Sequence, residues 1–174
     1  PFFMKYKTKS PSPKDIHKDI EVKFKHAGVT LFRGRELDTV IRYFNRKPIP
    51  SNAKMLDLGC GEGDVASILF NQVDVGIDIL SEEIKKAKKR KIYRELITAD
   101  AKKLPFKNDE FDVVFSNSVI EHISGIEKVI TEVGRVTRRG GSFIFTSPSR
   151  YFTDHLYISK ILRKFGLTFM AKSY

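Results

Sequence analysis

Apolar and polar positions follow two alternating patterns along this chain. Five short runs are largely apolar and end in polar residues, which is typical of strands buried in a parallel sheet. The segments after them carry apolar residues three or four positions apart, which indicates amphipathic helices. We predict strands at residues 55–58, 73–79, 96–101, 111–118 and 142–146, and helices at 64–70, from 81 onward and at 126–138. Strands that alternate with helices predict an α/β fold.

Boundary signals extend this pattern toward both ends of the sequence. Ser81 begins its helix in a capping pattern, and Gly140 with Gly141 should stop the helix at 126–138. Two helices are predicted before the first strand, at 12–28 and 35–45, and one after the fifth strand, at 154–165.

The first strand runs into a glycine-rich turn with the sequence D-L-G-C-G-E-G at residues 57–63. Glycines allow a tight turn and let a ligand approach the backbone closely. The dinucleotide fingerprint G-x-G-x-x-G needs its third glycine where Asp64 stands, so the spacing disfavours NAD. The acids Asp57, Glu62 and Asp64 suit a ligand with positive charge, such as the sulfonium and ammonium groups of S-adenosylmethionine. A glycine-rich turn without a ligand is the alternative.

Later strands also end in polar residues. Asp78 follows the second strand about 20 residues after the glycine-rich turn, the spacing at which a carboxylate meets ribose hydroxyls in doubly wound sheets. A carboxylate can accept hydrogen bonds from both hydroxyls. The third strand ends near Asp100, and the fourth ends in Ser116-Asn117-Ser118. Each acid alone is typical of a strand end or a helix cap, but their order along the chain favours a cofactor site.

Together these segments resemble the class I S-adenosylmethionine-dependent methyltransferases, in particular those that act on small molecules. The resemblance implies a Rossmann-like, doubly wound, mostly parallel sheet of order 3-2-1-4-5 with helices on both faces. The family fold adds strands 6 and 7, for which residues 147–174 offer no room, so we expect the native chain to continue past Tyr174. The matching segments are 56–63, 76–78, 99–101, 104–106, 111–114, 121–122 and 140–141.

The resemblance also implies roles for individual residues. Asp57 would support the ammonium group, Asp78 would hold the ribose, and Ile79 would pack on the adenine. Residues 1–50 would form a helical cap over the cofactor pocket, and residues 51–174 a Rossmann-like domain that is incomplete at its C-terminus. The implied cofactor-binding residues are Asp57, Gly59, Cys60, Gly61, Gly63, Asp78, Ile79, Asp100, Ala101, Ser116 and Asn117.

The net charge of +11 raises the question of a nucleic-acid substrate. Much of the excess is in a lysine-rich run at residues 85–91, which we interpret as a solvated helix face that packs through Ile84 and Ala87. The end of the fourth strand lacks the Asn/Asp-Pro-Pro-aromatic turn typical of enzymes that methylate base amino groups. We therefore expect a small-molecule substrate, with RNA as the alternative.

Composition adds further expectations about chemistry and location. Cys60 is the only cysteine, so no intrachain disulfide can form, and we predict a cytoplasmic protein. No Cys/His cluster has metal-ligand spacing, which predicts no metal site. His122, with Glu121 beside it, is the candidate general base, although it could instead pack at a helix start.

The sequence thus predicts an enzyme that moves a methyl group from S-adenosylmethionine by in-line displacement to a small-molecule acceptor such as a sugar, a lipid or another metabolite. An RNA methyltransferase and a non-catalytic S-adenosylmethionine-binding protein are the alternatives.

Overall fold

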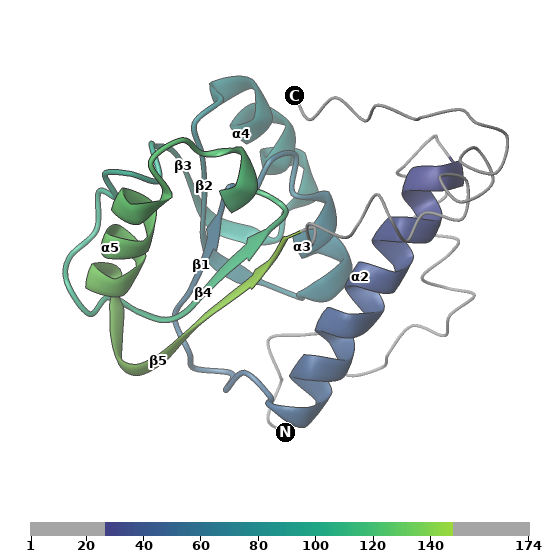
Figure 1. Ribbon diagram of the computed structural model, residues 1–174, viewed down its shortest axis with the longest axis horizontal. Coiled ribbons are helices and arrows are strands. Elements are labelled where there is room, and N and C mark those ends of the chain that lie inside the picture. Colours follow the sequence, from purple (N-terminus) through teal and green to yellow (C-terminus); the bar gives the residue numbers. More distant parts are fainter. Residues whose placement is uncertain (1–26, 148–174) are drawn as a thin grey trace, which may run out of the picture.

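The computed structural model describes residues 27–147 (Figure 1). Their strands form a five-stranded sheet with the order β3-β2-β1-β4-β5. Every pair of neighbouring strands is parallel, which confirms the predicted fold class. The strands are β1 (Met55–Leu58), β2 (Val73–Asp78), β3 (Tyr93–Thr98), β4 (Phe111–Asn117) and β5 (Thr137–Thr146).

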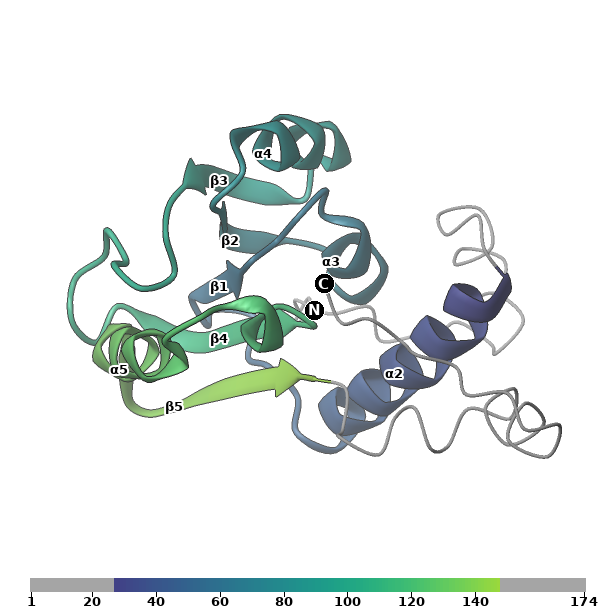
Figure 2. The ribbon, with the colours of Figure 1, turned by 45° about the horizontal axis from the view of Figure 1, so that its top comes forward.

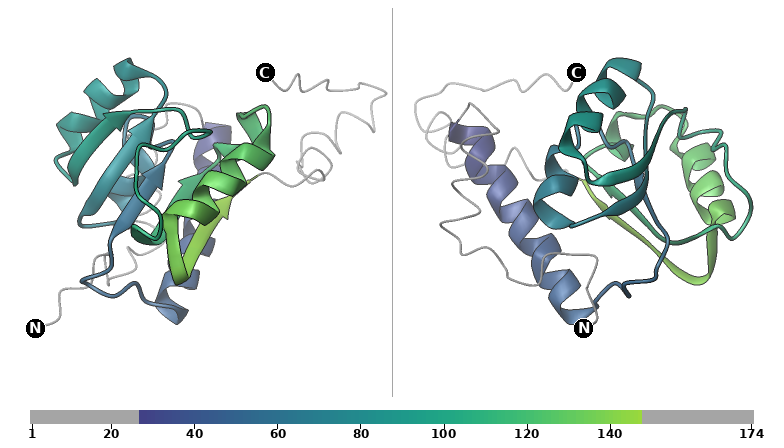
Figure 3. Two further views of the ribbon diagram at one scale, coloured as in Figure 1. Left: turned by 90° about the vertical axis from the view of Figure 1, so that its left-hand side faces the viewer. Right: turned by 180° about the vertical axis from the view of Figure 1, so that it is seen from behind.

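Helices cover both faces of this sheet. Figures 2 and 3 show α2 on the opposite side from α5, while α3 lies on the same side as α2. The helical elements are α2 (Ala27–Arg46), α3 (Asp64–Leu69), α4 (Ser81–Ala87) and α5 (Ile126–Val136), with the short 3₁₀ helices η1 (Lys88–Arg90) and η2 (Ile120–His122). No helix within residues 27–147 combines the length and apolar character that crossing a membrane requires.

Each face of the sheet buries its own apolar cluster. On the α2 and α3 side, Phe44, Phe70 and Phe115 pack edge to face or tilted, with ring centroids 5.2 to 6.3 Å apart. This cluster also contains Leu37, Val40, Ile41, Met55, Ile68 and Val113. On the α5 side, the cluster includes Leu56, Leu58, Val75, Ile77, Phe111, Val114, Val129 and Val133. Alternation along β1 therefore turns Met55 and Asp57 to the α2 side, and Leu56 and Leu58 to the α5 side.

Helix α2 differs from the two helices predicted for this region. It runs without a break from Ala27 to Arg46, so residues 29–34, which we expected to connect two helices, are helical. Leu37, Val40 and Phe44 give this helix an apolar face that packs into the sheet core. The predicted helix at residues 12–28 lies outside the described residues except for its last two positions, which are part of α2. The predicted helix at 154–165 lies outside them entirely.

Several predicted boundaries were wrong. Strand β3 begins at Tyr93 and ends at Thr98, earlier than predicted, because Arg94 and Glu95 are exposed on an edge strand that buries little of their surface. Helix α5 ends at Val136, and Gly140 and Gly141 lie within β5 instead of stopping the helix. The register between β4 and β5 shifts at this point. The residue before helix α4 is Leu80, so Ser81 does not cap it.

Candidate cofactor-binding site

The candidate site lies at the carboxyl ends of β1 and β4. The chain places β2 and β3 on one side of β1, and β4 and β5 on its other side. In doubly wound sheets, ligands bind in the crevice where the strand order reverses. The glycine-rich loop, residues 59–63, leaves β1 at this crevice and leads into α3.

Three glycines in this loop have positive φ angles, but their surroundings differ. Gly59 has φ +74°, and a Cβ there would lie 2.4 Å from the Val119 side chain. Gly63 has φ +77°, and its Cβ would lie 2.9 Å from the Tyr93 ring. Gly61 has φ +51° and faces open space, with no described atom within 4 Å of a Cβ. Packing thus fixes the two ends of the loop, whereas its centre leaves the backbone accessible to a ligand.

The end of β2 holds the loop through hydrogen bonds. The Asp78 carboxylate accepts a hydrogen bond from the Gly61 N–H and another from the Leu80 N–H, both at 2.9 Å. The N–H groups of Gly59 and Cys60 donate to the Ile77 carbonyl at 2.9 and 2.8 Å. A carboxylate has about four acceptor positions, so Asp78 keeps capacity for ribose hydroxyls.

Two large apolar side chains next to Asp78 are exposed. Ile79 is 63% exposed and Leu80 is 58% exposed, although both follow a buried strand. Apolar surface of this kind beside a polar crevice is suited to cover a flat ring such as adenine. The contact of Ile79 with adenine stays a prediction.

Asp57 lies beneath the loop and is 4% exposed. Its Oδ2 accepts a hydrogen bond of 2.7 Å from the Tyr93 hydroxyl. Burial raises the pKa of Asp57 to about 7, the Tyr93 hydrogen bond opposes this rise, and the charge of Asp78 adds to it. Burial also raises the pKa of Tyr93, so Tyr93 keeps its proton and remains the donor.

The sequence suggested that Glu62 and Asp64 also attract a positively charged ligand. In the structure, both acids are instead paired with cations of the protein. Glu62 accepts a hydrogen bond of 2.8 Å from the Lys86 ammonium. Asp64 forms an ion pair with Arg90. The attraction for a positively charged ligand therefore depends on Asp57 and Asp78.

Cys60 is a poor candidate for a nucleophile. Burial and the charges of Asp57 and Asp78 raise the pKa of its thiol. The thiol donates to the Gly61 carbonyl at 3.6 Å. A protonated, partly buried thiol is typical of a small packed residue and not of a nucleophile.

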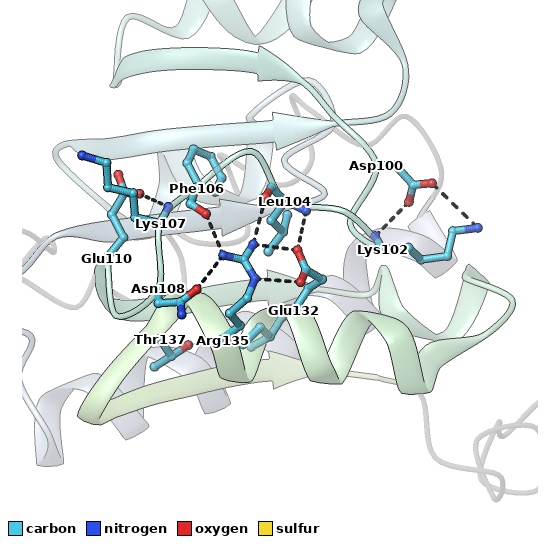
Figure 4. A network of polar contacts seen from close by, with 11 residues as sticks. Asp100, Lys102, Leu104, Phe106, Lys107, Asn108, Glu110, Glu132, Arg135 and Thr137 are labelled. Carbon is cyan, nitrogen blue, oxygen red and sulfur yellow. Dashed lines mark hydrogen bonds and ion pairs between the residues drawn. The ribbon is translucent and has the colours of Figure 1, made fainter.

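The loop between β3 and β4 carries Asp100 and Ala101. The Ala99 N–H donates to the Asp78 carbonyl at 2.9 Å, which brings the start of this loop beside the predicted ribose residue. Asp100 accepts a hydrogen bond of 2.9 Å from the Lys102 N–H, and the Lys102 ammonium lies 3.8 Å from its other oxygen (Figure 4).

Arg135 of α5 anchors the second half of the same loop (Figure 4). Its guanidinium donates to the carbonyls of Phe106 and Leu104 at 2.7 and 3.0 Å. It also pairs with Glu132 at 2.7 Å, and Glu132 accepts a hydrogen bond from the Leu104 N–H at 2.8 Å. These bonds hold the pKa of the Glu132 carboxyl down at about 2.

The two predicted residues at the end of β4 have different environments. Ser116 is fully buried, and its hydroxyl donates to the Leu58 carbonyl at 2.9 Å, so this hydroxyl serves the sheet. Both polar atoms of the Asn117 amide are buried and have no hydrogen-bond partner among the described residues. A buried amide in this state costs about 1–3 kcal/mol, which makes Asn117 a candidate for contact with a bound ligand.

Glu36 of α2 reaches the same strand end, a contact that sequence reasoning missed. Its carboxylate accepts a hydrogen bond of 2.8 Å from the Ser118 hydroxyl. Ser118 in turn donates through its N–H to the Thr146 carbonyl at 3.0 Å. Glu36 and Ser118 are 82 positions apart in the chain, and no local pattern indicates such a contact.

Tyr93 and Val119 were also missed, although both contact loop glycines. A glycine within a strand often marks the close approach of another group, so Gly76 in β2 was the available signal for Tyr93.

His122 ends η2 with its side chain 64% exposed and lies 4.0 Å from Glu121. Its role as a base stays a prediction. Within residues 27–147, no group of three His, Cys, Asp or Glu residues is arranged to hold a metal ion.

Comparisons with known proteins show the family of this chain. The family model described as "Methyltransferase domain" matches residues 56–145. The chain is 35% identical over 101 residues to a malonyl-acyl-carrier protein O-methyltransferase of Legionella pneumophila, covering 54% of this chain and 36% of the relative. It is 32% identical over 108 residues to a sarcosine/dimethylglycine N-methyltransferase of Aphanothece halophytica, covering 57% and 39%.

Among solved structures, the PH0226 protein of Pyrococcus horikoshii superposes with a TM-score of 0.54 at 32% identity, covering 72% of this chain and 62% of that one. The matched part of this chain spans less than half of the length of the Legionella pneumophila and Aphanothece halophytica methyltransferases. The family model covers more than half of the chain and includes β1 through most of β5. The chain therefore belongs to the class I S-adenosylmethionine-dependent methyltransferase family.

Proposed function

We propose that this protein transfers a methyl group from S-adenosylmethionine to a small-molecule acceptor. The observation that carries the proposal is the glycine loop, which is tied to Asp78 at the reversal of strand order and lies above the buried Asp57. When bound, S-adenosylmethionine supplies an electrophilic methyl group on its sulfonium. The residues present fit this cofactor, because an open backbone at Gly61, two acids and an exposed Ile79 match its polar, cationic and flat parts.

In this proposal, each part of the crevice holds one part of the cofactor. Asp57 faces the ammonium group, Asp78 accepts hydrogen bonds from the ribose, and Asp100 accepts one from the adenine amino group. Gly59, Cys60, Gly61 and Gly63 line the methionine part, Ile79 and Ala101 border the adenine, and Ser116 and Asn117 lie on the methyl side. Alignment of the two reactants and exclusion of water can contribute about 7–11 kcal/mol, so the reaction needs little further chemistry from the protein.

The end of β4 supports a small acceptor that donates hydrogen bonds. The Asn117 amide is buried without a partner among the described residues. The Glu36 carboxylate accepts a hydrogen bond from the hydroxyl of the next residue, Ser118. A carboxylate favours a hydroxyl or amine acceptor and repels a phosphate. The names of two relatives, a sarcosine/dimethylglycine N-methyltransferase and a malonyl-acyl-carrier protein O-methyltransferase, support an acceptor other than nucleic acid.

Helix α2 supports the proposed role of residues 1–50 as a cap over the pocket. Its apolar face packs into the same core as β1 and β4, and Glu36 extends from it to the carboxyl end of β4. In this proposal, the cap is packed on the Rossmann-like domain, residues 51–174, and contributes a polar group to the acceptor side.

Calorimetric titration with S-adenosylmethionine, S-adenosylhomocysteine and NAD tests the cofactor. We expect the first two to bind and NAD not to bind. Asp78→Ala should weaken binding at least tenfold, because a hydrogen bond to a charged group is worth about 1.5–3 kcal/mol. Asp38→Ala, which removes only a surface ion pair with Arg42, is the matched control and should bind like the wild type. Equal affinity of the Asp78→Ala variant would contradict the ribose assignment.

Transfer of a labelled methyl group to candidate acceptors tests the substrate class. The panel should contain amines, alcohols, carboxylic acids and total RNA. Labelling of an amine or alcohol is the expected result. Labelling of RNA that weakens steeply with added salt would instead favour a nucleic-acid substrate.

A further inference from the structure

Tyr93 reaches across a neighbouring strand to contact Asp57. It begins β3, whereas Asp57 is in β1, and β2 lies between them. Gly76 of β2 is the residue paired with Asp57 in the sheet register. The Tyr93 hydroxyl still comes within 2.7 Å of Asp57 Oδ2. A side chain can cross β2 at this position because Gly76 has none.

Two glycines provide the space for the Tyr93 ring. A Cβ at Gly76 would lie 2.7 Å from ring atom Cε1, and a Cβ at Gly63 would lie 2.9 Å from ring atom Cε2. Real Cβ atoms do not approach other atoms this closely. The ring therefore fills a notch between β2 and the start of α3, and its hydroxyl is directed to the carboxylate beneath the loop.

The neighbouring residues of η1 and α4 hold the same loop from the outside. Arg90 donates to the Glu62 carbonyl at 3.3 Å and pairs with Asp64. Lys86 pairs with the Glu62 carboxylate at 2.8 Å. The segment from α4 to β3 thus contacts the loop at the end that leads into α3, and Tyr93 is its innermost contact.

An ionised Asp57 needs a donor in this position. It is 4% exposed, so water offers its charge little support, and Asp78 repels that charge. The titratable or charged groups around the pair are Asp78 at the end of β2, Cys60 in the loop, and Asp64 of α3, which pairs with Arg90 of η1. Glu83 of α4 acts on Cys60.

We propose that Tyr93 is a positioning residue for the cofactor: its hydroxyl, admitted through the notch at Gly76 and Gly63, orients Asp57 and keeps it ionised so that it can receive the ammonium group. This inference rests on the proposed function, because it assumes that Asp57 faces that ammonium group. It makes Tyr93 and Gly76 part of the cofactor site, although neither residue needs to touch the cofactor.

Tyr93→Phe, which removes only the hydroxyl, tests the inference. Tyr43→Phe on the exposed side of α2 is the matched control. Two probes are titrated from about pH 5.5 to 8.5. This window surrounds the pKa of about 7 to which burial raises Asp57. S-adenosylhomocysteine carries the ammonium group, and 5′-methylthioadenosine lacks the whole amino-acid part. We expect Tyr93→Phe to move the midpoint of the pH profile of S-adenosylhomocysteine upward by about one unit. This shift should weaken its binding about fivefold at pH 7 and about tenfold at pH 6. The affinity for 5′-methylthioadenosine should not change.

Each other outcome has a distinct meaning. Equal losses for both probes, or an unmoved midpoint, would overturn the inference and leave Tyr93 as a packing residue. No binding of either probe to the wild type would instead contradict the proposed function. If Tyr93→Phe does not fold, Gly76→Ala displaces the ring but keeps the hydroxyl, and it should produce the same upward shift for S-adenosylhomocysteine alone. An unshifted profile in that variant would also overturn the inference.

Discussion

At the scale of single residues, the three loop glycines serve different purposes. Gly59 must have no side chain because Val119 occupies the adjacent space, and Gly63 because Tyr93 does. Gly61 has free space around its Cα, so only its backbone conformation and its exposure to a ligand constrain it. The same residue type therefore meets a steric requirement at two positions and a conformational one at the third.

Alanine substitution separates these requirements. Gly61→Ala should cost about 1–2 kcal/mol of unfolding free energy, the cost of left-handed backbone for a residue with a Cβ. Gly59→Ala carries the same cost and adds overlap with Val119, which contributes about 1–3 kcal/mol more. Val119→Ala in the Gly59→Ala background should recover the overlap part alone. Denaturant unfolding of the four proteins measures these differences, and equal stability of the two glycine variants would contradict the assignment.

Sequence reasoning could propose only those candidate site residues that lie at or near strand ends. Asp57 and Asp78 were predicted because each lies at or next to the end of an apolar run, at the edge where parallel strands place ligands. Glu36, Tyr93 and Val119 were not predicted, since each enters the site through a contact with a residue distant in sequence. The expectation for Glu62 and Asp64 failed for the same reason: their partners Lys86 and Arg90 come from another element.

At the scale of elements, the loop between β3 and β4 depends on one side chain of α5. The loop has no regular structure from Ala99 to Glu110, yet it carries Asp100 to the end of β2. The planar Arg135 guanidinium bonds two of its carbonyls and the Asn108 side chain. An ammonium group cannot reproduce this fork.

Arg135→Lys should therefore lower the unfolding free energy by about 1–3 kcal/mol, the usual cost of losing hydrogen bonds to partly buried carbonyls. Arg139→Lys, at an exposed position of β5, is the matched control and should change stability little. Hydrogen exchange adds a local measurement, with faster exchange expected for the Leu104 N–H, which Glu132 holds. Unchanged exchange in Arg135→Lys would show that the loop does not depend on this side chain.

Element types were easier to predict than element boundaries. Strands β1, β2 and β4 are buried on both faces, and their continuous apolar runs fix their ends closely. Strand β3 lies at a sheet edge with exposed Arg94 and Glu95, so its pattern is weaker and it was placed too late. The glycines at 140 and 141 looked like a helix stop, but a parallel strand with a register shift also accommodates them.

At the scale of the whole molecule, the order of the sheet follows from alternation of strand and helix together with the family resemblance, and it was confirmed. The packing of α2 could not be derived in this way. Its apolar stripe at Leu37, Val40 and Phe44 indicates a buried face but does not specify which surface covers it. Only the fold places this helix on the α3 side, where it joins the sheet core and brings Glu36 to the end of β4.

Asp57 couples the stability of the whole domain to cofactor binding, with opposite dependences on pH. Its pKa is about 7 in the folded protein and 3.8 as the ordinary value. Between these two pKa values the folded protein binds a proton that the unfolded chain does not. The contribution of Asp57 to the free energy of unfolding is therefore fully present below the lower value and is lost as pH rises through about 7. An ammonium ligand needs the ionised carboxylate, so its affinity should rise over the same interval and level off above it.

Thermal unfolding with and without S-adenosylhomocysteine measures both effects. At about one hundred times its dissociation constant, a ligand adds about 2.7 kcal/mol, which corresponds to a rise in Tm of about 5–10 °C for a domain of this size. As pH increases through 7, the Tm of the free protein should fall while the ligand-induced rise in Tm, at a fixed ligand concentration, should grow. Other groups also titrate in this range, so the wild type must be compared with Asp57→Asn. The amide of this variant cannot ionise. Both the Tm of the free protein and the ligand-induced rise in Tm should therefore depend less on pH than in the wild type. If the ligand-induced rise in Tm keeps its full pH dependence in Asp57→Asn, another group receives the ammonium. If the Tm of the free variant falls with pH as steeply as that of the wild type, Asp57 is already ionised in the folded protein at lower pH.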